Sequence, residues 1–118
     1  MNIRVKRIYE APGPEDGYRL LVDRLWPRGL SKQNAAFDAW MKEIGPSSQL
    51  RRWYGHDAER WPEFKQRYGE ELDGRPELVA DFLKLARAGT VTLLFSARDA
   101  KRNQAVALAE YLAARHES

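Results

Sequence analysis

An uninterrupted apolar run followed by a helical pattern, near the C-terminal end, most constrains how this chain folds. Residues 91–96 (Val-Thr-Leu-Leu-Phe-Ser) are typical of a buried strand. We expect the following helix to begin at or just after Asp99, its N-cap, and to run to about Arg115. Its inner face would consist of Ala105, Leu108, Ala109 and Leu112. A buried strand leading into an amphipathic helix favours a sheet with helices packed on it.

Two more strands are predicted near the N-terminus. Residues 3–9 begin with alternating apolar and basic side chains, and residues 18–23 contain the apolar run Leu-Leu-Val. Residues 11–17 between them are rich in Pro, Gly and acidic residues, which mark a turn. This link is too short for an ordinary helical crossover. The first strand is therefore either antiparallel or joined through a single tight turn.

Helical patterns fill most of residues 34–89. From Asn34 the side chains of Phe37, Trp40, Met41 and Ile44 are spaced as one helical face, which Gly45-Pro46 would end. Three further helices are predicted from their caps and apolar spacing. They span Ser47 or Ser48 to Trp53 or Tyr54, Pro62 to Gly74 with Phe64, Tyr68 and Leu72 inward, and Pro76 to Gly89 with Val79, Phe82, Leu83 and Ala86 inward.

Length and pattern together predict a single α/β domain over residues 1–118, built on a small, mostly parallel sheet of about three strands. Hydrophobic residues make up 43% of the chain, enough for one core. No apolar run approaches the roughly 20 residues of a bilayer span, and the first residues lack a signal core. We therefore expect a cytoplasmic protein without a membrane partner.

The composition also narrows the chemistry. There is no cysteine, and His56 and His116 are the two histidines, 60 positions apart, so we expect neither a metal site nor a cofactor. The net charge of +3 is mild, and the arginines are spread along the chain. A nucleic-acid partner is therefore less expected than a small molecule, since nucleic-acid binders usually concentrate Lys and Arg on one face.

Polar side chains follow the second and third predicted strands. In open α/β sheets ligands bind beyond the carboxyl ends of the strands, so parallel neighbours would bring both sets into one cleft. The first set is Asp23, Arg24, Trp26 and Arg28, and the second is Ser96, Arg98, Asp99 and Asn103. These eight residues are the predicted ligand-binding residues.

Several roles stay open at these positions. Asp23 is either a structural group paired with Arg24 or Arg28, or an acid, base or ligand anchor. His56 is either part of a helix end or a proton-transfer group. Together with Ser96 these two residues are the candidates for catalysis, and whether the protein is an enzyme is left undecided. The aromatic residues Trp26, Trp53, Tyr54 and Trp61 are either core residues or a stacking site for a planar ligand.

Four strings of the sequence resemble a known family. They are Asp-Gly-Tyr-Arg at 16–19, Leu-Val-Asp-Arg-Leu-Trp-Pro-Arg-Gly at 21–29, Leu-Arg-Arg-Trp-Tyr-Gly-His-Asp at 50–57, and Leu-Leu-Phe-Ser-Ala-Arg-Asp at 93–99. The chain resembles the YeaO-like branch of the domain of unknown function 488 family over almost its whole length. The resemblance implies a parallel α/β core and no established reaction. It also implies that Asn103-Gln104-Ala105 stand where longer relatives carry Cys-His-Arg, which removes the obvious nucleophile.

Two functions follow as alternatives. The first is a pocket for a small anionic molecule, such as a nucleotide or phosphate ester, which would either bind or transform it. The second is a non-enzymatic module that binds nucleic acid or a protein, suggested by a pI near 9.3. A pocket requires Asp23, Arg28 and Ser96 to converge in one concavity, whereas a nucleic-acid surface requires arginines along a continuous face.

Overall fold

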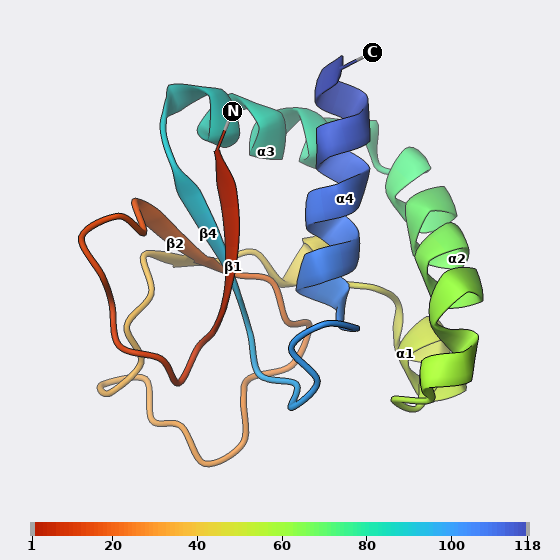
Figure 1. Ribbon diagram of the computed structural model, residues 1–118, viewed down its shortest axis with the longest axis horizontal. Helices are drawn as coiled ribbons and strands as arrows, with labels where there is room; N and C mark the ends of the chain where they lie inside the picture. The colour runs from red at the N-terminus through yellow and green to blue at the C-terminus, as the bar shows by residue number, and fades with distance from the viewer. Residues whose placement is uncertain (1, 118) are drawn as a thin grey trace.

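A parallel sheet of four strands forms the centre of the molecule. The computed structural model describes residues 2–117, with side chains described up to residue 115. The strands are β1 (Ile3–Arg7), β2 (Tyr18–Leu21), β3 (Ala39–Trp40) and β4 (Val91–Phe95), in the order β1-β4-β2-β3 (Figure 1). Both neighbours of β4 run parallel to it. The predicted α/β class and the predicted pairing of the second strand with the last are confirmed.

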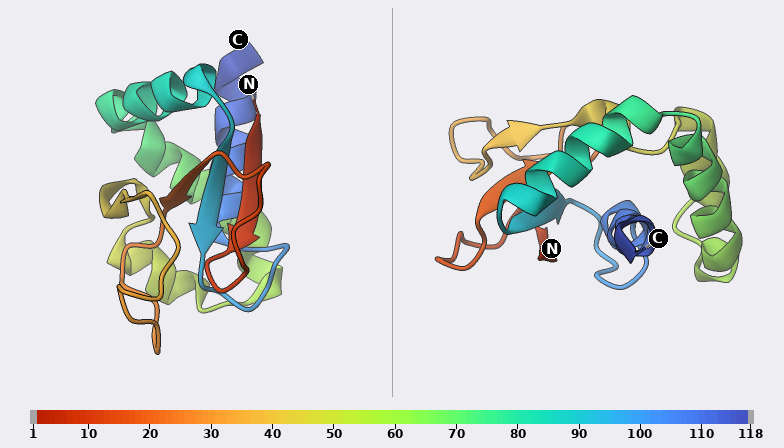
Figure 2. Two further views of the ribbon diagram at one scale, coloured as in Figure 1. Left: turned by 90° about the vertical axis from the view of Figure 1, so that its left-hand side faces the viewer. Right: turned by 90° about the horizontal axis from the view of Figure 1, so that it is seen from above.

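Four helices lie around the sheet: α1 (Ser48–Tyr54), α2 (Trp61–Asp73), α3 (Pro76–Ala88) and α4 (Gln104–Glu117). Helix α4 packs on β1 and β4, and α2 lies farther from the sheet, beyond α4 (Figures 1 and 2). The main core lies between the sheet and the helices. It contains Leu20 and Leu93 of the sheet, which are fully covered. No helix in the described residues is long and apolar enough to cross a bilayer.

An irregular segment with aromatic side chains covers the opposite face of the sheet. The next residues along the two central strands, Leu21 and Leu94, point to this face because side chains alternate along a strand. They are buried with Ile8 under four partly buried residues of the segment after β2, which are Trp26, Leu30, Phe37 and Trp40. The segment from Trp26 to Trp40, which is irregular apart from β3, therefore forms a second, aromatic layer and holds the loop after β2 against the sheet.

The helix predicted from Asn34 to Ile44 is wrong, and the sheet has four strands rather than about three. The segment instead forms the short strand β3 and a 3-10 turn over Lys42–Ile44. Its apolar side chains divide between the two faces, with Phe37 and Trp40 in the aromatic layer and Met41 and Ile44 in the main core. The backbone N–H of Met41 donates to Leu21 at 2.9 Å, which fixes β3 alongside β2.

The direction of β1 is now established, and the antiparallel alternative is wrong. β1 pairs with β4 in parallel register, from Ile3 with Val91 to Arg7 with Phe95. The chain then returns along the sheet without a helix and enters β2 on the far side of β4. A turn from Gly13 to Asp16, in which the N–H of Asp16 donates to the carbonyl of Gly13 at 3.1 Å, completes this return, and Gly17 follows it.

Helix α4 begins later than predicted. Asp99 does accept backbone hydrogen bonds, from Lys101 at 2.9 Å and Arg102 at 3.1 Å, but these close a turn ahead of the helix. The helix starts at Gln104, and Asn103 is its cap, since its Oδ1 accepts from the N–H of Val106 at 3.0 Å. Residues 96–103 are therefore a loop rather than a first helical turn. The expected starts and ends of α1, α2 and α3 are close to those observed.

Candidate functional site

The carboxyl ends of β2 and β4 meet at one edge of the sheet. The N–H of Val22 donates to Leu94 at 3.1 Å, so the two chains stay side by side after the strands end. One residue further on, Asp23 Oδ2 accepts from the N–H of Ser96 at 3.1 Å and from its hydroxyl at 2.6 Å. Two side chains that are 73 positions apart in the sequence are thus joined directly.

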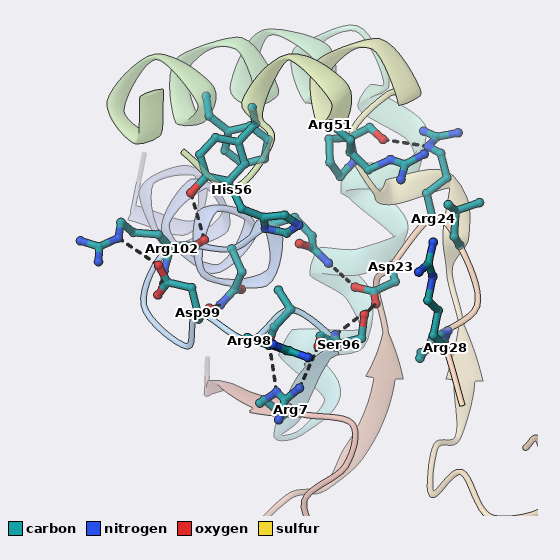
Figure 3. A pocket seen from close by; sticks show the side chains of 18 of the residues that line it. Arg7, Asp23, Arg24, Arg28, Arg51, His56, Ser96, Arg98, Asp99 and Arg102 are labelled. Carbon is teal, nitrogen blue, oxygen red and sulfur yellow. Dashed lines mark hydrogen bonds and ion pairs between the residues drawn. The ribbon is translucent and has the colours of Figure 1, made fainter. Parts of the chain in front are cut away.

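A depression of about 940 Å³ opens above this junction (Figure 3). Its walls come from the end of β1, the segment after β2, the loop between β4 and α4, and the C-terminal end of α1. All nine candidate residues from the sequence border it: Asp23, Arg24, Trp26, Arg28, His56, Ser96, Arg98, Asp99 and Asn103. Asp23, Arg28 and Ser96 therefore border one concavity.

Asp23 is a buried carboxylate held by neutral donors. Its exposed fraction is 6%, and the side-chain amide of Gln104 donates to its second oxygen. Of the alternatives for Asp23, an ion pair with Arg24 or Arg28 is wrong. Arg24 donates to the carbonyls of Gly45 and Pro46 at 2.8 Å, and no ion pair joins Arg28 to Asp23 among the described residues. Burial raises the pKa of Asp23, although the bonds from Ser96 and the charge of Arg51 oppose this effect.

The raised pKa of Asp23 predicts a specific pH dependence. A carboxyl whose pKa is higher in the folded state contributes stability that is complete below its unfolded pKa, near 3.8, and is lost as the pH rises. We therefore expect Asp23→Asn to be as stable as the wild type at pH 3.5 and more stable at pH 7, because asparagine keeps an acceptor without the buried charge. Urea unfolding at both pH values measures this, and a less stable variant at pH 7 would contradict it.

Arginines dominate the lining of the depression. Among the described residues seven arginines and two carboxylates, Asp23 and Asp99, border it. The ligand-binding residues predicted from the sequence include Arg24, Arg28 and Arg98, but not Arg7, Arg51, Arg52 and Arg102. These arginines are visible in the sequence as basic clusters, for example at residues 4–7 and 51–52. The sequence alone does not show which part of the fold the side chains of a short helix, such as those at 51–52, will face.

Three of these arginines have no protein partner. Arg7 donates to the carbonyls of Ser96 and Ala97, and Arg102 pairs with Asp99 at 3.1 Å. By contrast, the side chains of Arg28, Arg52 and Arg98 make no hydrogen bond or ion pair within the described part of the chain; Figure 3 shows Arg28 and Arg98 on different sides of the Asp23–Ser96 junction. The depression therefore offers free guanidinium groups.

Arg51 is the most unfavourably placed cation at this site. Among the described side chains its Nε is the buried polar atom that lacks a hydrogen-bond partner. Burial, followed by the neighbouring charges of Arg24 and Arg52, lowers the pKa of Arg51. Arg24 and Arg52 therefore both repel Arg51 beside the carboxylate of Asp23, and negative charge brought into this region would be attracted.

His56 lies on a different wall from the Asp23–Ser96 pair. Helix α1 ends at Gly55 in the left-handed conformation, and His56 follows with φ 59°. Its ring packs near Tyr54 with centroids 6.2 Å apart, and among the described residues no hydrogen bond joins it to Ser96 or Asp23. Asp57 caps the next turn at the N–H of Glu59. The three catalytic candidates thus form no nucleophile–base relay of the kind that covalent catalysis uses.

The aromatic residues divide between core and site. Tyr54 is a core residue that also borders the depression, whereas Trp53 and Trp61 pack on the outer part of the main core. Trp26 packs edge-on against Phe37 and Trp40 in the aromatic layer. The side chain of His116 lies outside the described residues. Among those described, no three His, Asp or Glu side chains are placed to hold a metal ion.

Comparison with known proteins finds relatives that match this chain over nearly their whole length. A family model described as the inactive DUF488-N3 subclade matches residues 2–118. An uncharacterised protein of Mycobacterium tuberculosis is 43% identical over 110 residues, which cover 93% of this chain and 92% of the relative. The uncharacterised protein YeaO of Escherichia coli is 40% identical over 112 residues, 95% of this chain and 97% of the relative. No solved structure matches at a significant level.

Proposed function

Because the chain belongs to the DUF488 family, in the group described as its inactive N3 subclade, we propose that it binds a small anionic molecule without transforming it. The observation that carries this proposal is the set of three unpaired arginines, Arg28, Arg52 and Arg98, around one depression. A guanidinium presents a planar fork of donors that matches phosphate and carboxylate oxygens. An anion in the depression would occupy donors that the protein leaves free.

Electrostatics favours an anion for a second reason. The like charges of Arg24, Arg51 and Arg52 lie close together, and the burial of Arg51 limits screening by water. Each added negative charge relieves this repulsion as well as forming new contacts. The arginines border a concavity instead of following an extended face, which favours a small molecule over the alternative of a nucleic-acid-binding module.

The polar groups nearest the Asp23–Ser96 junction form hydrogen bonds within the protein, which supports binding without catalysis. The hydroxyl of Ser96 donates to Asp23, Asn103 caps α4, and the amide of Gln104 holds the second oxygen of Asp23. By its resemblance to longer relatives, the chain carries Asn103 and Gln104 where those proteins have a cysteine and a histidine. The residues at these positions therefore stabilise the site and provide no nucleophile.

Arg28→Lys tests this proposal. Arg28 lies in a turn between the buried Pro27 and Gly29, it is exposed, and it has no side-chain partner among the described residues. We expect an unchanged melting temperature and a weaker affinity for inorganic phosphate, by about 1.5–3 kcal/mol, because an ammonium cannot replace a charge-assisted bidentate contact. Isothermal titration calorimetry measures the affinity.

Arg87→Lys is the matched control, since Arg87 is exposed on α3 and does not border the depression. It should bind phosphate like the wild type. Equal phosphate affinity in the wild type and Arg28→Lys would contradict the role of Arg28. A wild-type protein that binds neither phosphate nor other small anions would contradict the proposed function itself.

A further inference from the structure

Exposed apolar side chains gather at the same depression as the free arginines. In residues 2–115 three large hydrophobic residues are exposed, which are Tyr9 at 46%, Tyr18 at 38% and Leu25 at 62%. Two of them, Tyr9 and Leu25, border the depression. The ring of Tyr9 lies under the guanidinium of Arg7, and its hydroxyl donates to the carbonyl of Arg28 at 3.2 Å. The depression therefore combines exposed apolar surface with free guanidinium groups, which favours a ligand that has an apolar part over an inorganic anion.

His56 provides a second, independent observation. Within the described residues it is the non-glycine residue with a positive φ, a conformation that costs free energy for a side chain with a Cβ. Its imidazole points into the depression from the end of α1 (Figure 3), and no described residue hydrogen-bonds to it. Asp57 is engaged with Glu59 and Arg60. Backbone strain of this kind concentrates at ligand-binding positions.

The ring of His56 is backed by a packed aromatic series. It lies 6.2 Å from Tyr54, whose ring stacks on Phe64 at 4.4 Å with an interplanar angle of 25°. The hydroxyl of Tyr54 donates to the carbonyl of Arg102 at 3.1 Å, so this wall is tied to the loop before α4. The wall is therefore rigid and presents a flat ring to the depression, and Arg28 and Arg98 lie across the space from it (Figure 3).

We infer that the ligand is a nucleoside monophosphate, with its base against the ring of His56 and its phosphate among the free guanidinium groups of Arg28, Arg52 and Arg98. This inference rests on the proposed function and adds a planar ring to the anion. The volume of about 940 Å³ is sufficient for such a ligand, since small-molecule sites measure roughly 300–1,000 Å³. Every nucleobase can stack on an aromatic side chain. The site therefore specifies a planar ring and does not specify which base carries it.

The test compares ligands that carry one or both parts. Calorimetric titrations would use the four ribonucleoside 5′-monophosphates, ribose 5-phosphate, the matching nucleosides and inorganic phosphate. We expect at least one nucleotide to bind about tenfold or more tightly than ribose 5-phosphate, the contribution of one stacked base. If ribose 5-phosphate binds as tightly as every nucleotide, the inference fails and the proposed function stands. If no phosphate compound binds, or nucleosides equal their nucleotides, the proposed function fails as well.

The variant His56→Asn tests whether the ring of His56 provides the additional affinity for a nucleotide. Asparagine tolerates the left-handed conformation, so the fold should be kept while the ring is removed. We expect the nucleotide affinity of this variant to fall toward that of ribose 5-phosphate, whose own affinity should not change. Arg28→Lys should instead weaken both ligands by similar factors. A His56→Asn variant that binds nucleotides like the wild type, with an unchanged melting temperature, would overturn the inference.

Discussion

Replacing Gly17 with alanine is expected to lower the free energy of unfolding by about 3 kcal/mol or more. Gly17 has φ 63°, and an added Cβ would lie 2.3 Å from the carbonyl oxygen of Thr90 and 2.9 Å from its carbon. Both atoms are backbone, so no side-chain rotation relieves the overlap. The same oxygen accepts the N–H of Tyr18 at 2.9 Å, at the start of β2, so the strain would act where this strand joins β4.

Two other glycines allow the effect of the overlap with Thr90 to be separated from the effect of backbone strain. Gly29 has φ 72° with open space around the Cβ position, so Gly29→Ala should cost only the backbone strain, about 1 kcal/mol. Gly89 has extended backbone and open space, so Gly89→Ala should be nearly neutral. Urea unfolding of the three variants measures the series. Equal losses for Gly17→Ala and Gly29→Ala would show that the overlap with Thr90 is not present.

Arg19→Met is expected to cost about 3–5 kcal/mol, which is typical of breaking a buried ion pair from one side. Arg19 is 5% exposed and Asp16 is 1% exposed, and their side chains pair directly. Arg19 also donates to the carbonyl of Ala36 at 2.7 Å, so it joins the turn before β2 to the segment before β3. The hydrogen bond from the N–H of Gly13, together with those from Lys6 and Arg19, outweighs the effect of burial and lowers the pKa of Asp16 to about 2. Without Arg19 a buried negative charge would therefore keep only Lys6 as its ionic partner.

The control for Arg19→Met is Arg87→Met, which removes the same groups from an exposed position on α3. A surface change of this kind should alter the free energy of unfolding by less than about 0.5 kcal/mol. Thermal and urea unfolding of both variants give the comparison. Similar stabilities for the two variants would mean that the Asp16–Arg19 pair does not hold the return from β1 to β2.

The helices and strands that could be predicted are those whose own sequence shows the spacing of their buried side chains. The run at 91–96 and the spacing of Phe64, Tyr68 and Leu72 correspond to β4 and α2, because each element buries one continuous set of side chains. The helix predicted over residues 34–44 was wrong because the apolar side chains of this segment pack on both faces of the sheet. Which side chain packs on which face depends on strands that other segments form. The direction of β1 likewise depended on its pairing with β4, 88 positions away.

The candidate site was predictable for a related reason. Parallel neighbours bring their carboxyl ends together, which places Asp23 beside Ser96 without further information. The start of α4 was not predictable from capping alone, because Asp99 and Asn103 both suit a cap and only packing decides between them. Gln104 and Arg51 were missed because their contacts depend on where α4 and α1 lie on the sheet.

The central claim, that the arginine-lined depression receives a small anion, is tested most directly by nuclear magnetic resonance. Inorganic phosphate would be added to the ¹⁵N-labelled protein, and the backbone amide signals followed as it saturates. The structure places Ser96, Arg98, Arg28 and His56 around one depression, so their amides and those of their neighbours should shift together with a single dissociation constant. Amides of the exposed face of α3 should not move. Shifts that are absent, or that scatter over lysines and arginines away from the depression, would contradict the claim.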